Sequence, residues 1–211
     1  SMPITIAICG YSVAAAIIFT YVGMTNEFAT AGYGAATRIE QVVLLPILGI
    51  NTALISIIAQ NYGAKKYDRI KETYFTAIKY SFFIMVISGV IIFLTANIIP
   101  KFFSDNFEVL DYGKRYLKIS AFVLPAYPFF FLTNGFFMAL KKSENAMLNN
   151  IARNVLVPIV VFYLAKYLSV DYDNFFWLWV IFQWLVSIIL LIVVNYYLNN
   201  KLYKSSTVVN P

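Results

Sequence analysis

The stretch that decides the fold covers residues 36–60 and reads ATRIEQVVLLPILGINTALISIIAQ. Its only charged residues, Arg38 and Glu40, lie within the first five positions. The rest of the stretch is predominantly apolar, and a helix needs about 20 such residues to cross a bilayer. The stretch therefore predicts a transmembrane helix that carries two charged residues near one end.

The composition of the whole chain agrees with this prediction. Of the 211 residues, 61% are hydrophobic and 12% are charged, whereas soluble domains carry about 25% charged residues. The excess apolar surface must face lipid, which predicts an all-α, polytopic membrane protein. The apolar runs predict six spans, at residues 3–24, 36–60, 74–99, 116–140, 146–168 and 175–198.

The connections between these runs are short, so we expect residues 1–211 to form a single six-helix membrane unit. Ser1 and Met2 resemble a scar left by tag cleavage and are excluded from the fold.

Several functional classes are not expected from the residue types present. The sequence has no histidine and one cysteine, Cys9, which excludes an internal disulfide, histidine metal sites and histidine-based nucleophilic catalysis. No aspartate lies within a predicted span, so we expect neither an intramembrane enzyme nor a metal site. The net charge of +6 comes from short basic segments between apolar runs, which is typical of membrane topology rather than nucleic-acid binding.

The basic segments also predict the orientation of the chain. They follow the second, fourth and sixth spans and comprise Lys65, Lys66, Arg69, Lys71, Lys141, Lys142, Lys201 and Lys204. Because cytoplasmic loops are enriched in lysine and arginine, we expect both termini to be cytoplasmic, with the protein in the cell's inner (plasma) membrane.

Prolines interrupt three of the predicted spans. Pro46 lies in the second, Pro125 and Pro128 in the fourth, and Pro158 in the fifth. Each removes a backbone donor and bends its helix. Two interpretations stay open: a static kink used for packing, or a hinge that lines a cavity.

Polar residues within the spans follow helical stripes. Glu40 and Asn51 are separated by only about 20° around the second helix, and Gln41 lies on a neighbouring stripe. Tyr127 and Asn134 are spaced by seven on one face of the fourth span. These five residues are the candidates for a substrate cavity.

The two arginines inside spans need separate explanations. Arg38 lies about 160° from Glu40 around the helix, so we expect it to anchor the outer interface rather than pair with Glu40. Arg153 lies deeper, where a charge costs on the order of 3 kcal/mol. It either extends to the cytoplasmic interface or faces the protein interior, paired with Glu144 or capping helix ends. Gln183 is expected to form an interhelical hydrogen bond.

Two segments resemble a known family. They are LPILGINTALISIIAQNYGAKKYDRI (residues 45–70) and NGFFMALKKSENAMLNNIARNVLVPI (134–159). They resemble the second six-helix half of a MATE (multidrug and toxic compound extrusion) transporter. This family usually shows Gly-Gln-Asn-x-Gly-Ala after the second span of that half. Here Ala59 replaces the first glycine, Met138 stands where glutamine is common, and Lys141 where glycine is usual.

The resemblance implies one lobe of a twelve-helix transporter. Such a transporter exports amphipathic, often cationic organic compounds by alternating access, coupled to H⁺ or Na⁺ and without another cofactor. Its partners would be the lipid bilayer, small organic substrates, and either the missing N-terminal lobe or a second, parallel copy. The chain would then be a truncated half or a half-size protein that dimerises.

Some branches of the family carry acidic cation ligands in the first and fourth spans of this lobe. Both are lacking here, so Glu40 is the local candidate and the coupling site otherwise lies in the other half. Two alternatives stay open: half of a related lipid-linked oligosaccharide flippase, whose cavity is more cationic, and a non-transporting membrane fragment.

Overall fold

A computed structural model of the chain describes residues 2–202, with side chains described for residues 10–200. All regular elements in that range are helical. In chain order they are α1 Met2–Gly23, α2 Glu27–Gly63, α3 Tyr67–Thr95, η1 Ile99–Phe102, α4 Phe107–Ser120, η2 Leu124–Ala126, α5 Tyr127–Ala139, α6 Ser143–Ile151, η3 Ala152–Leu156, α7 Val157–Tyr167, α8 Tyr172–Tyr197 and η4 Leu198–Leu202.

These elements form rods of membrane-spanning length. Four rods are long and apolar enough to cross a membrane: α2, α3, the continuous run from α6 to α7, and α8 with its extension. The helices α4 and α5 form a fifth, bent by 41°. The helix α1 has 22 residues, or about 33 Å at 1.5 Å per residue. The predicted class, an all-α polytopic membrane protein, is confirmed.

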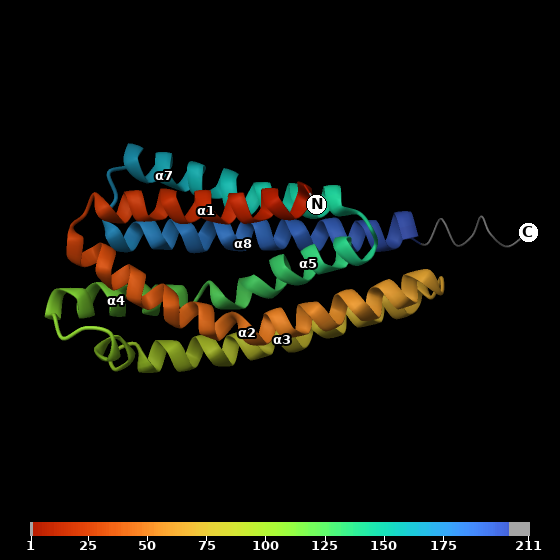
Figure 1. Cartoon of the computed structure of the whole chain (residues 1–211), viewed down its shortest axis with the longest axis horizontal. Coiled ribbons are helices and arrows are strands. Elements are labelled where there is room, and N and C mark those ends of the chain that lie inside the picture. Colours follow the sequence, from red (N-terminus) through yellow and green to blue (C-terminus); the bar gives the residue numbers. More distant parts are fainter. Residues whose placement is uncertain (1, 203–211) are drawn as a thin grey trace, which may run out of the picture.

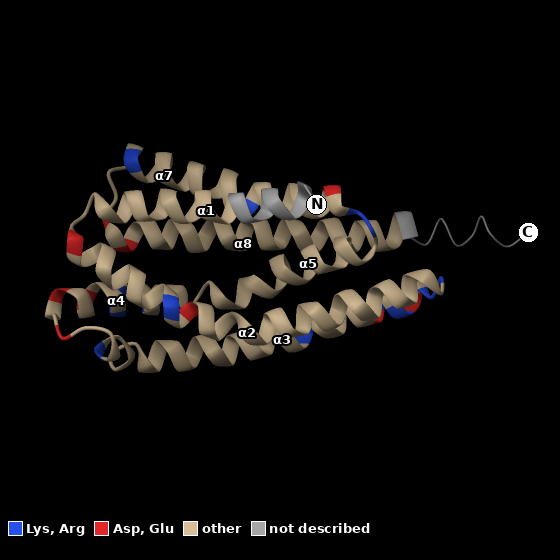
Figure 2. Cartoon of the chain, viewed as in Figure 1, with Lys and Arg blue, Asp and Glu red and all other residues tan. Residues whose placement is uncertain are grey.

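The rods lie lengthwise in two groups (Figure 1). The helices α1, α7 and α8 form one group, and α2 and α3 form the other, with α4 and α5 contacting members of both. The turns at residues 64–66 and 140–142 lie at the same end of the bundle. Figure 2 shows lysine and arginine positions gathered there along the ribbon, whereas acidic positions are more frequent at the opposite end.

Helix-capping residues set several boundaries that differ from the predicted spans. The helix α2 begins at Glu27 rather than residue 36, because Asn26 Oδ1 accepts a hydrogen bond from the Ala29 amide at 2.7 Å. The helix α8 begins at Tyr172 because Asp171 accepts from the Asn174 amide at 3.0 Å. Hydropathy locates the apolar part of a helix, whereas the caps determine where the helix begins.

The prolines have three different consequences. The fourth span breaks between Ser120 and η2, which contains Pro125, and Pro128 then lies in the first turn of α5, where no donor is needed. In the fifth span the π-helical turn η3 immediately precedes the helix that carries Pro158. The helix α2 continues through Pro46 as one element.

Close packing holds α2 against α4, the two helices that later meet at the candidate site. A Cβ built on Gly32 would lie 2.6 Å from the Val109 carbonyl oxygen and 2.8 Å from the Gly113 amide nitrogen. Only glycine allows the two backbones to approach this closely. On the outer surface of α3, Phe83, Ile87 and Leu94 are exposed, as expected for side chains that face lipid.

Candidate functional site

A cavity of about 860 Å³ opens among the helices and is the candidate functional site. Side chains of α1, α2, α4, α5, α6, η3 and α8 line it. Its volume falls in the range of pockets that bind small organic molecules. Most lining residues are apolar or aromatic, and among the described residues only Glu40 and Arg153 contribute formal charge to the lining.

Glu40 is held in the cavity wall by two tyrosines. It projects from α2, is 8% exposed, and accepts hydrogen bonds from the hydroxyls of Tyr116 on α4 and Tyr127 on α5. Tyr33 packs edge-on against Tyr116 with ring centroids 4.9 Å apart. Because hydrogen bonds to a charged acceptor are stronger than neutral ones, this arrangement offsets part of the cost of removing the carboxylate from water.

Arg153 lies in the wall on the π-helical turn η3 and is 8% exposed. Its Nε donates to Gln183 Oε1 of α8 at 2.9 Å. Its guanidinium carbon lies 4.1 Å from the Phe130 ring centroid, 4.8 Å from that of Tyr127 and 5.5 Å from that of Phe131. A desolvated cation over an aromatic face gains about 2 kcal/mol.

These contacts decide between the two interpretations of Arg153. The side chain faces the protein interior rather than extending to an interface. Its partner there is Gln183 and not Glu144, which lies exposed in the first turn of α6. The expected interhelical hydrogen bond of Gln183 is present, because α8 passes directly beside the π-helical turn.

The other predicted cavity residues divide into two groups. Gln41 and Tyr127 line the cavity together with Glu40. Asn51 and Asn134 are outside its lining. Asn51 packs against Gly135, where an added Cβ would lie only 2.1 Å from Asn51 Oδ1. Asn51 is eleven residues beyond Glu40, or about 16 Å along the helix. The two side chains therefore point to the same side of α2 but lie at different levels along its axis.

The remaining predicted residues lie around the cavity rather than in its wall. Arg38 is on the exposed side of α2, and Pro46 is exposed as well. Pro125 borders a separate apolar niche between α3 and α8. Pro158 is buried at the start of α7. These placements are compatible with both interpretations of the prolines, as static kinks or as hinges.

Sequence reasoning missed several contributors to the site. The predicted span 116–140 has Tyr116 at its edge, although the spacing of eleven between Tyr116 and Tyr127 matches the spacing between Glu40 and Asn51. The cation–π partner Phe130 and the lining residue Asn154 carry no distinctive sequence signal. They belong to the site because α5 and the π-helical turn η3 line the same cavity.

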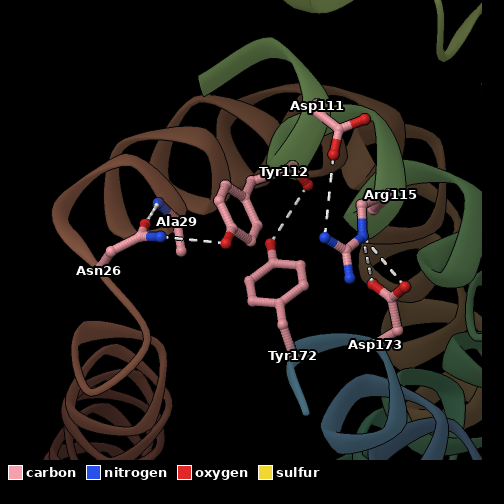
Figure 3. Close-up of polar contacts among 7 residues, drawn as sticks. All are labelled: Asn26, Ala29, Asp111, Tyr112, Arg115, Tyr172 and Asp173. Carbon is pink, nitrogen blue, oxygen red and sulfur yellow. Dashed lines mark hydrogen bonds and ion pairs between the residues drawn. The ribbon is translucent and has the colours of Figure 1, made fainter. Parts of the chain in front are cut away.

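A polar network closes the end of the bundle where α1 turns into α2 (Figure 3). Arg115 Nε contacts both carboxylate oxygens of Asp173 at 2.9 and 3.0 Å, and Arg115 Nη1 lies 3.8 Å from Asp111. Tyr172 donates to the Tyr112 carbonyl at 3.3 Å, and the Asn26 amide donates to the Tyr112 hydroxyl at 3.0 Å. The network joins the α1–α2 corner, α4 and the start of α8.

The described part of the chain contains no group of three or more acidic, cysteine or histidine residues that could hold a metal ion. Within the described lining, Glu40 is the single carboxylate available to a cation. The described lining therefore combines a largely apolar wall with one carboxylate and one guanidinium.

Comparison with known proteins places this architecture in a family. The MatE family model matches residues 3–164. A protein named FAD transporter from Shewanella oneidensis is 26% identical over 154 residues, which cover 73% of this chain and 34% of that protein. The probable multidrug resistance protein YpnP of Bacillus subtilis is 23% identical over 150 residues, 71% of this chain and 32% of that protein.

Solved structures show the same fold. An outward-facing multidrug resistance MATE family transporter superimposes with a TM-score of 0.89 at 21% identity, covering 96% of this chain and 46% of that one. A MOP superfamily transporter from Pyrococcus furiosus gives a TM-score of 0.88 over 94% of this chain and 45% of that one. The matches thus cover about a third of each of these curated relatives and under half of each solved chain. Because the family model spans well over half of the sequence, the chain belongs to the MatE family.

Proposed function

We propose that the chain is a single six-helix lobe of a membrane exporter that moves amphipathic organic compounds by alternating access in exchange for H⁺ or Na⁺. The observation that carries this proposal is a buried carboxylate, Glu40, in the wall of a largely apolar cavity of about 860 Å³. A carboxylate in that position contacts both the coupling cation and the space that a ligand occupies.

The hydrogen bonds of Glu40 supply a mechanism for coupling. The ionised carboxylate accepts from Tyr116 and Tyr127, which lie on opposite sides of the break in the fourth span. A protonated carboxyl group gains one O–H donor and loses acceptor capacity, so one tyrosine hydroxyl would change from donating to Glu40 to accepting from it. Proton gain and loss at Glu40 would thereby change the contact between α2 and the two halves of the bent span.

The same proposal covers the membrane and the partners. The basic turns at residues 64–66 and 140–142 lie at one end of the bundle, which supports a cytoplasmic position for that end and for both termini in the plasma membrane. Exposed apolar residues on α2, including Leu45 and Leu48, offer a surface for the N-terminal lobe or a parallel second copy. Lobes of six spans share one orientation.

The charge of the cavity favours an exporter over the flippase alternative. A lipid-linked pyrophosphate would need several cationic groups, whereas the described lining holds one arginine and one glutamate. The family resemblance implies that many substrates are cationic, and Glu40 is the acidic residue that such compounds would meet.

The decisive experiment measures export of ethidium, a cationic aromatic dye, from cells that express the natural full-length protein. Glu40→Gln keeps the shape of the side chain but removes its charge, and should reduce export by about tenfold or more, because hydrogen bonds to charged groups contribute about 1.5–3 kcal/mol. Glu27→Gln, at the exposed start of α2, is the matched control and should retain export. Undiminished pH- or Na⁺-dependent export by Glu40→Gln would remove Glu40 from the coupling mechanism, and no export by the unaltered protein would overturn the exporter proposal.

A further inference from the structure

Arg153 is a buried cation without a direct anionic partner. The guanidinium nitrogens have no carboxylate oxygen within 4.0 Å among the residues the structure describes; the ion pairs found there belong to Arg69 and Arg115. Buried charges in proteins are normally paired with an opposite charge. Aromatic rings surround the guanidinium of Arg153, and its side chain lines the cavity, where a ligand could reach it.

Glu40 does not serve as that partner. Both of its oxygens accept hydrogen bonds from tyrosines, and one of these, Tyr127, also packs beside the guanidinium of Arg153. The two charges of the cavity thus share Tyr127 as a neighbour but form no direct ion pair with each other. A ligand that brought a second anionic group could pair with Arg153 without displacing the hydrogen bonds of Glu40.

The wall around Arg153 offers further hydrogen-bond donors. Gln183 is 2% exposed, and its Oε1 accepts from Arg153, while its buried Nε2 has no acceptor among the described groups. Asn154 lies beside Arg153 in the same cavity lining and carries another amide. These side chains meet because η3 is a π-helical turn, a feature that occurs frequently at functional sites.

We infer that Arg153 binds the carboxylate or phosphate group of an amphipathic aromatic ligand, with Gln183 as a second donor to the same group. The inference rests on the proposed function in taking this cavity as the substrate site. Phe131 and Trp179, which line the same cavity, would contact the aromatic body. The substrate class is therefore extended from the cationic compounds that Glu40 would meet to compounds that carry an acidic group at Arg153.

Three probes with one aromatic body test this inference. They are 1-naphthylacetate, its neutral amide 1-naphthylacetamide, and the cation 1-naphthylmethylamine, measured by equilibrium dialysis against the purified natural transporter in lipid nanodiscs. The carboxylate should bind about 10- to 100-fold more tightly than the amide, as expected for charge-assisted hydrogen bonds. Equal binding of the carboxylate and the amide, or tighter binding of the amide, would overturn the inference, whereas the amine reports separately on binding at Glu40.

Variants assign the effect to the residue. Arg153→Gln should bring the carboxylate-to-amide ratio close to one, whereas the control Arg38→Gln, an exposed arginine outside the cavity lining, should leave the ratio unchanged. If Arg153→Gln does not fold, Gln183→Glu decides, because it places a carboxylate beside Arg153 and should abolish the preference by competing with the probe. An unchanged ratio in the folded Arg153→Gln, or failing that in Gln183→Glu, contradicts the inference.

The binding assay separates this inference from the proposed function. Selective binding of the carboxylate in a protein that exports nothing would support the anion site and reject the exporter. Export of ethidium, combined with equal affinities for the carboxylate and amide probes, would support the exporter and reject the anion site.

Discussion

Replacement of two glycines on one helix provides a direct test of the packing that positions Glu40. Gly32 and Gly49 both lie within α2. A Cβ on Gly32 would meet the α4 backbone at 2.6 and 2.8 Å, whereas a Cβ on Gly49 would meet nothing within 4 Å. Gly32→Ala therefore forces α2 and α4 apart, and Gly49→Ala does not.

The expected magnitudes follow from these distances. Alanine in place of a helical glycine favours folding by about 0.5–1 kcal/mol, a gain that both variants share. Only Gly32→Ala adds the cost of overpacking, about 1–3 kcal/mol, because the atoms it meets are backbone and cannot rotate away. The free energy of unfolding should thus be about 1–3 kcal/mol lower for Gly32→Ala than for Gly49→Ala.

Reversible unfolding in mixed micelles with increasing SDS, followed by tryptophan fluorescence, measures this difference. Gly32→Ala should also weaken ligand binding in the cavity, since α4 carries Tyr116, a hydrogen-bond donor to Glu40. Equal free energies of unfolding for the two alanine variants would refute the close α2–α4 contact.

Two further predictions concern the ends of the bundle. A double-mutant cycle with Arg115→Gln and Asp173→Asn should show a coupling free energy of about 0.5–1 kcal/mol that decreases with salt, because both side chains are partly exposed to solvent; additive effects would contradict the pairing. After Cys9→Ala, thiol reagents should label Lys65→Cys and Lys141→Cys only from the cytoplasmic side, and labelling from outside would reverse the proposed topology.

The fourth span shows which structural features a residue pattern can predict and which it cannot. Pro125 and Pro128 predict a bend, and the helix pair is bent by 41°. The consequence for the site could not be predicted, because it depends on where the two halves point. The break places Tyr116 and Tyr127 on separate helices whose hydroxyls nevertheless meet on one carboxylate.

Arg153 is a second residue for which the sequence predicts one property and the tertiary structure decides another. The position of Arg153 within the predicted fifth span indicates a charge inside the membrane. Hydropathy does not predict which way its side chain points. The direction is decided by neighbours distant in sequence, including Gln183, which is 30 residues away. Arg153 lies on a π-helical turn before Pro158 and lines the cavity, and such a turn has no reliable sequence signal.

The sequence by itself determined the membrane class, the all-helical spans, the side on which basic turns gather and the opposite directions of Arg38 and Glu40. These properties depend on apolar run length, charge placement and the 3.6-residue period, which are local. The tertiary structure alone decided that Glu40 meets two tyrosines, 76 and 87 residues away, and that Asn51 and Asn134 fall outside the cavity lining. Helical phase gives the direction of a side chain, whereas its depth and partners depend on how the helices pack.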